Sequence, residues 1–358
     1  MELNFYKGKT VLVTGDTGFK GSWLSLWLLS LGARVIGYAL PPKKGEHFEA
    51  CGLGQKIEHV DGDIRYARSL QKIINKVKPE IAFHLAAQPL VLQSYKDPIE
   101  TFETNVIGTA NYLEAVRACK SMRAAVVITT DKVYENQGNG PAFKESDPLG
   151  GHDPYSASKA AAEIVTQSYS RLFFAENTGL AAASARAGNV IGGGDFAQYR
   201  IVPDCVRALQ AGKPIVVRNP HSIRPWQHVL EPLYGYLLLG ASLSIKGKVF
   251  SGPWNFGSLS AQSRTVEQLA NEIIAAWGAG TVNYLDPEKP RPKEAEYLHL
   301  NSSKATRFLG WKRIFTFREA VKNTVDEYRI MEHAGPEELF RDRIGRIKSF
   351  ENKIKIKK

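Results

Sequence analysis

Short apolar runs alternate with helix-like stretches through the first half of the chain. Six short runs have the length and apolar character of buried strands, at residues 9–14, 34–38, 57–60, 81–85, 125–129 and 181–186, and the first of them is rich in β-branched residues. Helical spacing of apolar positions lies between them, at residues 22–31, 69–77, 101–119 and 158–172. Because parallel strands need crossover connections, this order predicts an α/β fold with a Rossmann-type, doubly wound parallel sheet.

The regular alternation ends near residue 186. Helical spacing returns at residues 202–211, 265–277 and 317–333, among loops rich in Gly and Pro. We therefore expect a Rossmann domain over residues 1–185 that also receives a strand from about 220–250. Residues 186–335 would form a smaller, discontinuous C-terminal domain that binds the substrate, and residues 336–358 a basic tail.

Hydrophobic residues make up 43% and charged residues 23% of the 358-residue chain, which excludes disordered, collagen-like and coiled-coil classes. The most apolar helical stretch, residues 23–31, is too short to span a bilayer. Residues 1–9 carry charges where a signal peptide is apolar. Three widely spaced cysteines fit neither a disulfide framework nor a metal site, so we expect a soluble, cytoplasmic protein without bound metal.

The formal net charge of +11 permits nucleic acid, a membrane surface or anionic small molecules as partners. Residues 341–358 hold eight Lys and Arg against two acids and so carry +6 of that charge. Phe350 is the only aromatic residue in this segment, which makes the segment a poor binder of single-stranded nucleic acid. We therefore expect anionic small molecules as partners, and neither nucleic acid nor membrane.

A glycine-rich loop, Gly15-Asp-Thr-Gly-Phe-Lys-Gly21, joins the first predicted strand to the first helix. Glycine at every third position lets the backbone turn tightly and approach a pyrophosphate, and the following helix offers free N–H groups. We expect a nicotinamide dinucleotide here. The expected contacts from this loop are Gly15, Thr17, Gly18, Phe19, Lys20 and Gly21.

Residues after the third and fourth strands are further candidates for cofactor contact. Asp63 and Ile64 follow the third strand, where the carboxylate could hold the adenine amino group. Leu85, Ala86 and Ala87 follow the fourth strand, where small side chains let a dinucleotide pass close to the backbone.

Two features of this cofactor site are unusual. Asp16 places a negative charge within the loop, so we expect Coulomb repulsion to weaken binding, partly offset by Lys20. The second strand ends in Tyr38-Ala-Leu-Pro, without the acid that usually holds the adenosine ribose. Lys43 and Lys44 follow closely, so NADP stays open beside the favoured NAD.

Thr130, Tyr155 and Lys159 form a candidate catalytic set. Thr130 follows the fifth strand, and Tyr155 and Lys159 share one helical face because they are four residues apart. A neighbouring lysine cation lowers the pKa of a phenol toward neutral, so we expect Tyr155 to act as a base. Lys159 could also contact the nicotinamide ribose, and Thr130 could orient a substrate alcohol.

The segments GDTGFKG, HLAAQ, TTDKVY and YSASK together resemble the extended short-chain dehydrogenase/reductases, and within them the nucleotide-sugar 4,6-dehydratases. Three further segments, RAGNVIGGGD at 186–195, RPWQHV at 224–229 and SKATRFLGW at 303–311, resemble the CDP-glucose 4,6-dehydratases. The resemblance covers about residues 5–330 and leaves the basic C-terminal segment outside.

The resemblance implies an NAD-dependent hydro-lyase that turns CDP-glucose into CDP-4-keto-6-deoxyglucose, on the route to deoxysugars of surface polysaccharide such as lipopolysaccharide O-antigen. Tyr155 would take the 4-OH proton while C4 gives hydride to NAD; water leaves across C5 and C6, and the hydride returns to C6. Asp131 would be the acid, with a pKa raised by burial. Relatives carry Glu at the position of Lys132, so the C5 base stays open: Lys132 could act as a neutral amine, relay through water or stabilise the enolate.

The resemblance also implies substrate contacts and a partner. The expected substrate-binding residues are Gln88, Asn189, Arg200, Arg224 and Arg291. Arginine forks suit the diphosphate of a sugar nucleotide. A homodimer is expected through the helices at residues 101–119 and 158–172.

Other functions remain open. An NAD-dependent epimerase or decarboxylase, or a 4,6-dehydratase for another nucleotide sugar, would use the same fold, although epimerisation needs no acid such as Asp131. A regulatory protein that only senses a dinucleotide, or that binds nucleic acid, would not need Thr130, Tyr155 and Lys159 together.

Overall fold

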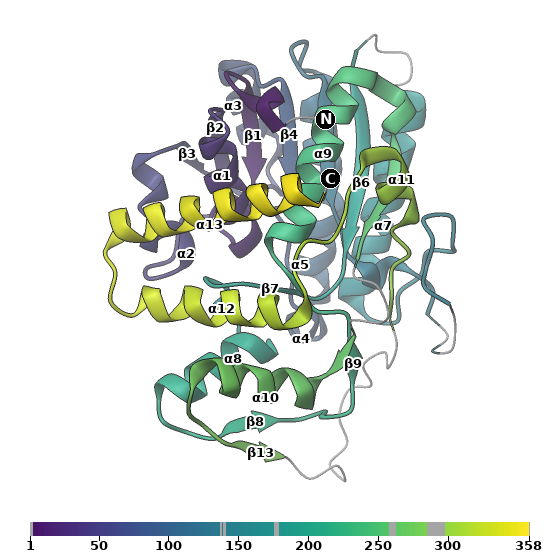
Figure 1. Ribbon diagram of the computed structural model, residues 1–358. Helices are drawn as coiled ribbons and strands as arrows, with labels where there is room; N and C mark the ends of the chain where they lie inside the picture. Colours follow the sequence, from purple (N-terminus) through teal and green to yellow (C-terminus); the bar gives the residue numbers. More distant parts are fainter. Residues whose placement is uncertain are drawn as a thin grey trace.

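A seven-stranded parallel sheet forms the centre of the computed structural model, which describes residues 3–136, 138, 141–174, 179–257, 263–284 and 298–357 (Figure 1). The strand order is β11-β6-β5-β4-β1-β2-β3, and each neighbouring pair is parallel. The strands are β1 (Thr10–Thr14), β2 (Arg34–Ala39), β3 (Glu58–Asp61), β4 (Ile81–His84), β5 (Ala124–Ile128), β6 (Ala181–Ala187) and β11 (Gly252–Phe256). The predicted fold class is confirmed, and the six predicted strands each lie within about one residue of their expected bounds.

Helices cover both faces of the sheet and build a smaller lobe beyond it. The longer helices are α1 (Phe19–Ser30), α3 (Ala67–Val77), α6 (Gly108–Arg117), α7 (Pro154–Leu172), α8 (Ile201–Gln210), α9 (Leu230–Lys246), α10 (Val266–Trp277), α12 (Phe317–Met331) and α13 (Pro336–Ile356). The shorter helices are α2 (His47–Ala50), α4 (Val91–Lys96), α5 (Pro98–Phe102) and α11 (Ser303–Leu309). A π-helical turn (Glu103–Ile107) joins α5 to α6, and 3-10 turns lie at Leu3–Tyr6, Leu53–Gln55, Asp131–Val133 and Gly247–Phe250.

Alternate side chains of the central strands enter two separate cores. In β1, Val11 and Val13 pack on the face that α1, α9 and α13 cover. Leu12 points to the opposite face, which α3, α6 and α7 cover. Because both faces are buried, these strands are apolar at almost every position, which is why they could be recognised from the sequence.

The small lobe lies at the bottom of Figure 1 and contains α8, α10 and two paired strands, β8 (Ile215–Val217) and β13 (Val282–Tyr284). Two more short pairs connect the lobe to the sheet: β7 (Val190–Ile191) with β10 (Gln227–His228), and β9 (Ile223–Arg224) with β12 (Arg264–Thr265). The C-terminal half also returns to the sheet through α9 and β11. A domain boundary near residue 186 therefore stays a prediction.

Residues 230–246, in the region expected to supply a strand, form the helix α9 instead. The strand that completes the sheet is β11, which pairs with β6 and begins just after that region. Every residue from Leu230 to Leu243 is buried, so the run lacks the polar face that marks a surface helix. The length of this run favours a helix over a strand, whereas the strand that the sheet receives from this half of the chain lies just beyond the expected region.

The segment expected to be a basic tail is a 21-residue helix packed on the body of the protein. α13 crosses α1 on the side of the sheet that α9 covers (Figure 1). Phe350 lies against Trp27 and Phe315, with ring centroids 5.6 and 5.1 Å away. Glu351 accepts a hydrogen bond from Trp27 Nε1 at 2.7 Å. The basic residues thus belong to a structural helix, because its apolar face has a core to join.

The described part of the chain holds no helix that combines the length and the apolar character needed to cross a bilayer. Cys51, Cys119 and Cys205 are buried free thiols.

We expect Phe350→Ala to lower the free energy of unfolding by about 3–5 kcal/mol, because it removes a fully buried ring from a packed core. Lys348→Ala, at an exposed position of the same helix, is the matched control and should change it by less than about 0.5 kcal/mol. Urea denaturation followed by circular dichroism measures both variants. Equal midpoints for the two would show that this core does not hold α13.

Candidate active site

The carboxyl ends of β1 and β4 lie side by side, although the chain leaves these two strands toward opposite edges of the sheet. Ligands of doubly wound sheets bind at such a crevice. Gly15, after β1, has φ +76°, and a Cβ added there would lie 2.6 Å from Ala86 N, after β4. Glycine is therefore required for the two loops to approach this closely and form the floor of the crevice.

A cavity of about 310 Å³ opens at this crevice. It is lined by every residue predicted to contact the cofactor: Gly15, Thr17, Gly18, Phe19, Lys20, Gly21, Asp63, Ile64, Leu85, Ala86, Ala87, Tyr155 and Lys159. α1 begins at Phe19, and its N-cap Gly18 has no side chain to satisfy the first backbone N–H groups. These amides and the positive end of α1 suit a pyrophosphate, so the residues present fit a dinucleotide.

Asp16 does not line this cavity, which corrects the expected repulsion of the cofactor. Its side chain is completely buried, and Oδ2 lies 2.7 Å from Nδ1 of His59. Burial raises the pKa of Asp16, although the hydrogen bond and charge of His59 oppose the shift. Burial works to lower the pKa of His59, but Asp16 and Asp61 raise it. The negative charge is thus balanced by His59, which removes the physical reason to expect weak binding.

At the end of the cavity expected to hold adenosine, the contacts of Asp63 and the positions of two lysines differ from the expectation. Asp63 lines the cavity, but Arg65 engages its carboxylate, with Arg65 Nε 2.9 Å from Oδ2. Although burial favours the neutral acid, Arg65 lowers the pKa of Asp63. Lys43 and Lys44 are exposed and do not line the cavity, so these two lysines offer no support for NADP.

A second cavity of about 390 Å³ adjoins the first. The two share the lining residues Phe19, Lys20, Pro89, Thr129, Tyr155 and Arg200. Thr130, Asp131 and Lys132 line only the second cavity. Tyr155 therefore stands between the dinucleotide crevice and the place for a second molecule, which is the arrangement that hydride transfer needs.

Tyr155 lies in the first turn of α7, a helix that begins before the predicted residue 158. Asp153 caps it: Oδ1 accepts a hydrogen bond from Ser156 N at 2.9 Å, and Pro154 occupies the first turn. An Asp followed by Pro is typical of a helix N-terminus, so this pair could have indicated in the sequence that α7 begins here. The cap holds Tyr155 and Lys159 on consecutive turns of one rigid helix.

Burial raises the pKa of Tyr155 to about 12, although a hydrogen bond with Thr130 works in the opposite direction. Lys159 Nζ donates to the Ile128 carbonyl at 3.2 Å, and burial lowers the pKa of Lys159 to about 8. Burial is the largest influence on the pKa of Tyr155 and Arg200 is a cation that opposes it, so the expectation that Lys159 lowers this pKa stays a prediction.

Asp131 is 3% exposed, and burial raises its pKa, as predicted, against the charges of Lys132 and Arg224. Oδ1 accepts a hydrogen bond from Thr130 Oγ1 at 3.0 Å. Oδ2 has no hydrogen-bond partner among the described residues. A buried carboxyl group with a raised pKa can hold a proton and give it up, as a general acid must.

The expected substrate contacts divide into two groups. Asn189, Arg200 and Arg224 line the second cavity. Arg224 is 5% exposed, and Arg200 Nη1 lies 2.9 Å from Oδ2 of Asp195. Arg291 lies outside the described residues.

Gln88 lines neither cavity, contrary to the expectation. Its Nε2 donates to the Leu90 carbonyl at 3.1 Å and to Thr101 Oγ1 at 2.9 Å, and its Oε1 accepts from Leu90 N. The polar atoms of this side chain make hydrogen bonds that hold the loop after β4, so the side chain does not face a substrate.

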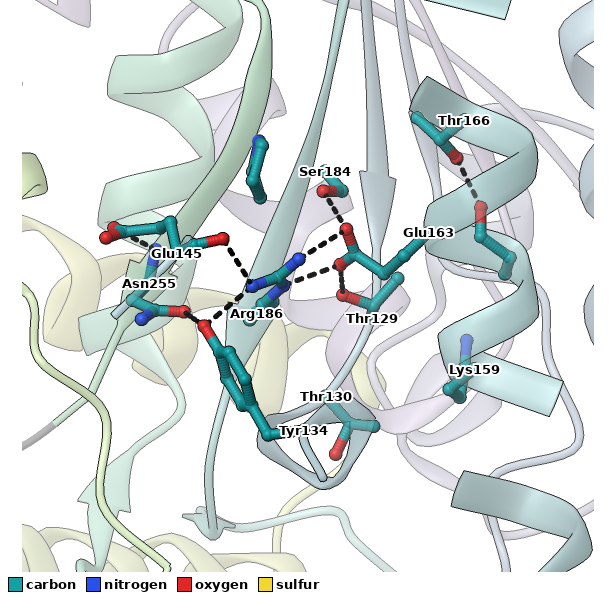
Figure 2. Close-up of polar contacts among 12 residues, drawn as sticks. Thr129, Thr130, Tyr134, Glu145, Lys159, Glu163, Thr166, Ser184, Arg186 and Asn255 are labelled. Atoms are coloured by element: carbon teal, nitrogen blue, oxygen red, sulfur yellow. Dashed lines mark hydrogen bonds and ion pairs between the residues drawn. The ribbon is translucent and has the colours of Figure 1, made fainter. Parts of the chain in front are cut away.

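Two polar groups behind the site were not predicted from the sequence. Asn105, in the π-helical turn, accepts from Gln88 N at 2.9 Å and donates to Ser158 Oγ at 2.9 Å. It thereby ties the loop after β4 to α7. Glu163 and Arg186 form a buried ion pair beside Thr129 (Figure 2). In each case the sequence places a polar residue on the buried face of a helix or strand, and that pattern could have indicated a polar contact behind the site.

The chain belongs to a family of dehydratases: the family model described as GDP-mannose 4,6 dehydratase matches residues 12–324. The CDP-glucose 4,6-dehydratase of Salmonella typhimurium is 48% identical over 87% of this chain and 88% of its own length. The CDP-paratose 2-epimerase of Salmonella typhi is 31% identical over 67% of this chain and 78% of its own length.

Solved structures agree with this family. A dTDP-glucose 4,6-dehydratase from Streptomyces venezuelae, with NAD and TYD bound, has a TM-score of 0.77 at 26% identity and covers 89% of this chain and 97% of that one. A UDP-glucose 4-epimerase from Thermus thermophilus in complex with NAD has a TM-score of 0.76 at 27% identity, with coverage of 89% and 99%. The resemblance drawn from the sequence motifs is confirmed.

We expect Asp16→Asn to leave the Kd for NAD within about threefold of the wild-type value, because its carboxylate does not face the cavity. The variant should unfold more easily, by about 1–3 kcal/mol, because His59 loses a charged partner. Lys20→Ala, which removes a cation that lines the cavity, is the comparison and should weaken binding more. Calorimetric titration and thermal melts measure both effects; a Kd for Asp16→Asn tightened by about tenfold would restore the repulsion argument.

Proposed function

We propose that this protein is a CDP-glucose 4,6-dehydratase that uses NAD. The observation that carries the proposal is the meeting of Thr130, Asp131 and Tyr155 at a cavity that adjoins the dinucleotide crevice. The choice of CDP-glucose is supported by 48% identity to the Salmonella typhimurium enzyme of that name. The choice of NAD is supported by the S. venezuelae relative, whose structure contains it.

Tyr155 takes the proton of the sugar 4-hydroxyl, and Thr130 orients that hydroxyl. Because the pKa of Tyr155 is raised to about 12, the phenol needs a cation close by before it can act as a base at neutral pH. Lys159 is one turn away and can supply that cation when it contacts the nicotinamide ribose. When bound, NAD supplies hydride acceptance from C4 and hydride return to C6, so the overall reaction involves no net redox change.

Asp131 gives its proton to the 6-hydroxyl, which leaves as water, while the C5 proton passes to a water molecule in the cavity and is relayed along Lys132. The raised pKa of Asp131 and its Oδ2 atom, which has no partner among the described residues, support this role. Lys132 lines the same cavity, where its charge stabilises the enolate that forms between C4 and C5. A proton returns to C5 when C6 has been reduced. Arg200, Arg224 and Asn189 hold the diphosphate.

The main test is incubation with NAD and CDP-glucose. We expect a CDP-sugar that has lost one water, detected by mass spectrometry, and the alkaline absorbance of a 4-keto sugar. Asp131→Asn should still oxidise C4 but dehydrate at least about 100-fold more slowly, so that NADH absorbance accumulates. The matched control is Asp326→Asn, which breaks an ion pair with Lys322 on α12 and lines neither cavity.

Other outcomes of this incubation separate the alternatives. An isomer of unchanged mass would favour an epimerase, and equal rates with UDP-glucose or dTDP-glucose would contradict the choice of CDP. No turnover of any sugar nucleotide would contradict an enzyme of this class. Normal dehydration by Asp131→Asn would remove Asp131 as the acid.

The product suits a route to deoxysugars, of the kind found in lipopolysaccharide O-antigen. We place the reaction in the cytoplasm, because free thiols such as Cys51, Cys119 and Cys205 persist in a reducing compartment.

A homodimer is supported by exposed apolar side chains on neighbouring helices. They lie on α5, on the π turn, on α7 and at its C-cap, at Ile99, Phe102, Ile107, Ile164, Leu172 and Phe173. Ile164 is 60% exposed and Ile107 54% exposed. These elements contact one another, and exposed apolar side chains gathered on neighbouring elements are typical of an interaction site. We propose that this face pairs with the same face of a second copy, as the two-fold symmetry of most dimers requires.

We expect Ile164→Arg to shift the protein from dimer to monomer, because it places a charge in this apolar face. Ile245→Arg is the matched control: this residue is 56% exposed but lies on α9, which covers the opposite face of the sheet. Light scattering coupled to size-exclusion chromatography gives the mass of each. If Ile164→Arg keeps the mass of two chains, the dimer forms elsewhere.

A further inference from the structure

A buried ion pair lies behind the candidate active site (Figure 2). Arg186 on β6 donates from Nε and Nη2 to the two carboxylate oxygens of Glu163 on α7, each at 3.0 Å. The side chains are 1% and 0% exposed. Taking two charges out of water is costly, and replacing such a pair with apolar residues often does not reduce stability. Its presence therefore calls for a reason other than stability.

Each oxygen of the Glu163 carboxylate accepts a second hydrogen bond, from a hydroxyl group, in addition to the one from Arg186. Thr129 Oγ1 donates to Oε1 and Ser184 Oγ donates to Oε2, each at 2.5 Å. Arg186 has further partners: Nη1 donates to Tyr134 Oη at 2.6 Å and to the Glu145 carbonyl at 3.4 Å, and the guanidinium lies over the Tyr134 ring. Charged groups that are bound on every side keep one geometry.

Each partner of Glu163 belongs to an element that carries part of the site. Thr129 directly follows β5 and precedes Thr130. Glu163 lies one helical turn after Lys159 and two turns after Tyr155 on α7. A single carboxylate thus connects the loop that bears Thr130 with the helix that bears Tyr155 and Lys159.

We propose that Glu163 is a positioning residue: its hydrogen bond with Thr129 fixes the end of β5 against α7, and so aligns Thr130 with Tyr155. This rests on the proposed function, in which those two residues act on the sugar hydroxyl. Arg186 supports the arrangement by holding the Glu163 carboxylate in one orientation. The second hydroxyl on that carboxylate, from Ser184, lies within β6 and carries no part of the site.

The charge of Glu163 also acts on Lys159. Burial lowers the pKa of Lys159 to about 8, and Glu163 opposes that shift. The charge of Lys159 also acts on Lys20 on α1 and on His84 on β4, and neither of these groups favours the protonated form of Lys159. Without the Glu163 charge, Lys159 should lose its proton at lower pH.

Three variants test the hydrogen bond. Thr129→Val keeps the shape but removes the donor, and we expect kcat for CDP-glucose to fall about 10- to 100-fold with KM changed by less than about threefold. Thr129→Ser keeps the donor and should recover most of kcat. Ser184→Ala is the matched control: it removes the other hydroxyl from the same carboxylate and should lower the melting temperature without lowering kcat more than about twofold.

A fourth variant tests the charge. Glu163→Gln should shift the alkaline limb of the kcat profile to lower pH, because activity that needs protonated Lys159 is lost as pH rises through a lower pKa. If Glu163→Gln does not fold, Glu163→Gln/Arg186→Gln removes both charges together and should show the same shift. If the folded variant shows no shift of the alkaline limb, the proposed effect of the Glu163 charge on Lys159 is overturned.

The measurements distinguish failure of the proposed function from failure of the positioning role of Glu163. No turnover by the wild-type protein would overturn the proposed function. Wild-type turnover with equal kcat in Thr129→Val and Ser184→Ala would leave the function standing and overturn the positioning role, as would failure of Thr129→Ser to recover activity.

Discussion

The parallel direction of all seven strands is the constraint on which the rest of the molecule depends. Parallel strands end at one edge of the sheet, so the loops that follow them meet there although they are far apart in sequence. Gly15 follows β1, Ala86 follows β4, Thr130 follows β5, and Asn189 follows β6. All of them line one of the two adjoining cavities. The returning helices bring the start of α1 and the Tyr155 turn of α7 to the same edge.

Buried charges hold the segments near this edge in place. Glu163 and Arg186 connect α7 with β6 and the end of β5, and Asp16 with His59 connects the glycine loop with β3. Glu327 on α12 accepts a hydrogen bond from Gly193 N at 2.7 Å, in the loop after β7. Each of these charges has its partner on a different element of the fold. Removing one partner of such a pair leaves the other charge buried and unpaired, so each pair ties its two elements together.

The parts of the fold that could be predicted are those with a strong local signal. Short apolar runs predicted six strands, and the glycine loop with its neighbouring strand ends predicted the lining of the dinucleotide cavity. α9 and α13 were not predicted, for opposite reasons. α9 is apolar on all sides and lacks a periodic pattern. α13 is strongly basic, and its few apolar positions, Leu339, Ile347 and Phe350 among them, do not by themselves indicate a packed helix. In both cases the missing information was what the helix packs against.

Residue identities and their spacing were thus enough to establish the dehydratase family, the cofactor crevice and the candidate catalytic residues, because such motifs depend on local backbone geometry and on short-range chemistry. Charge and protonation needed the folded molecule. The tertiary structure turned Asp16 away from the cavity, raised the pKa of Tyr155 and brought Glu163 to Thr129. The physical reason is that the free energy of a charge depends on how far it is removed from water and on which partners surround it, and both are properties of the packed chain.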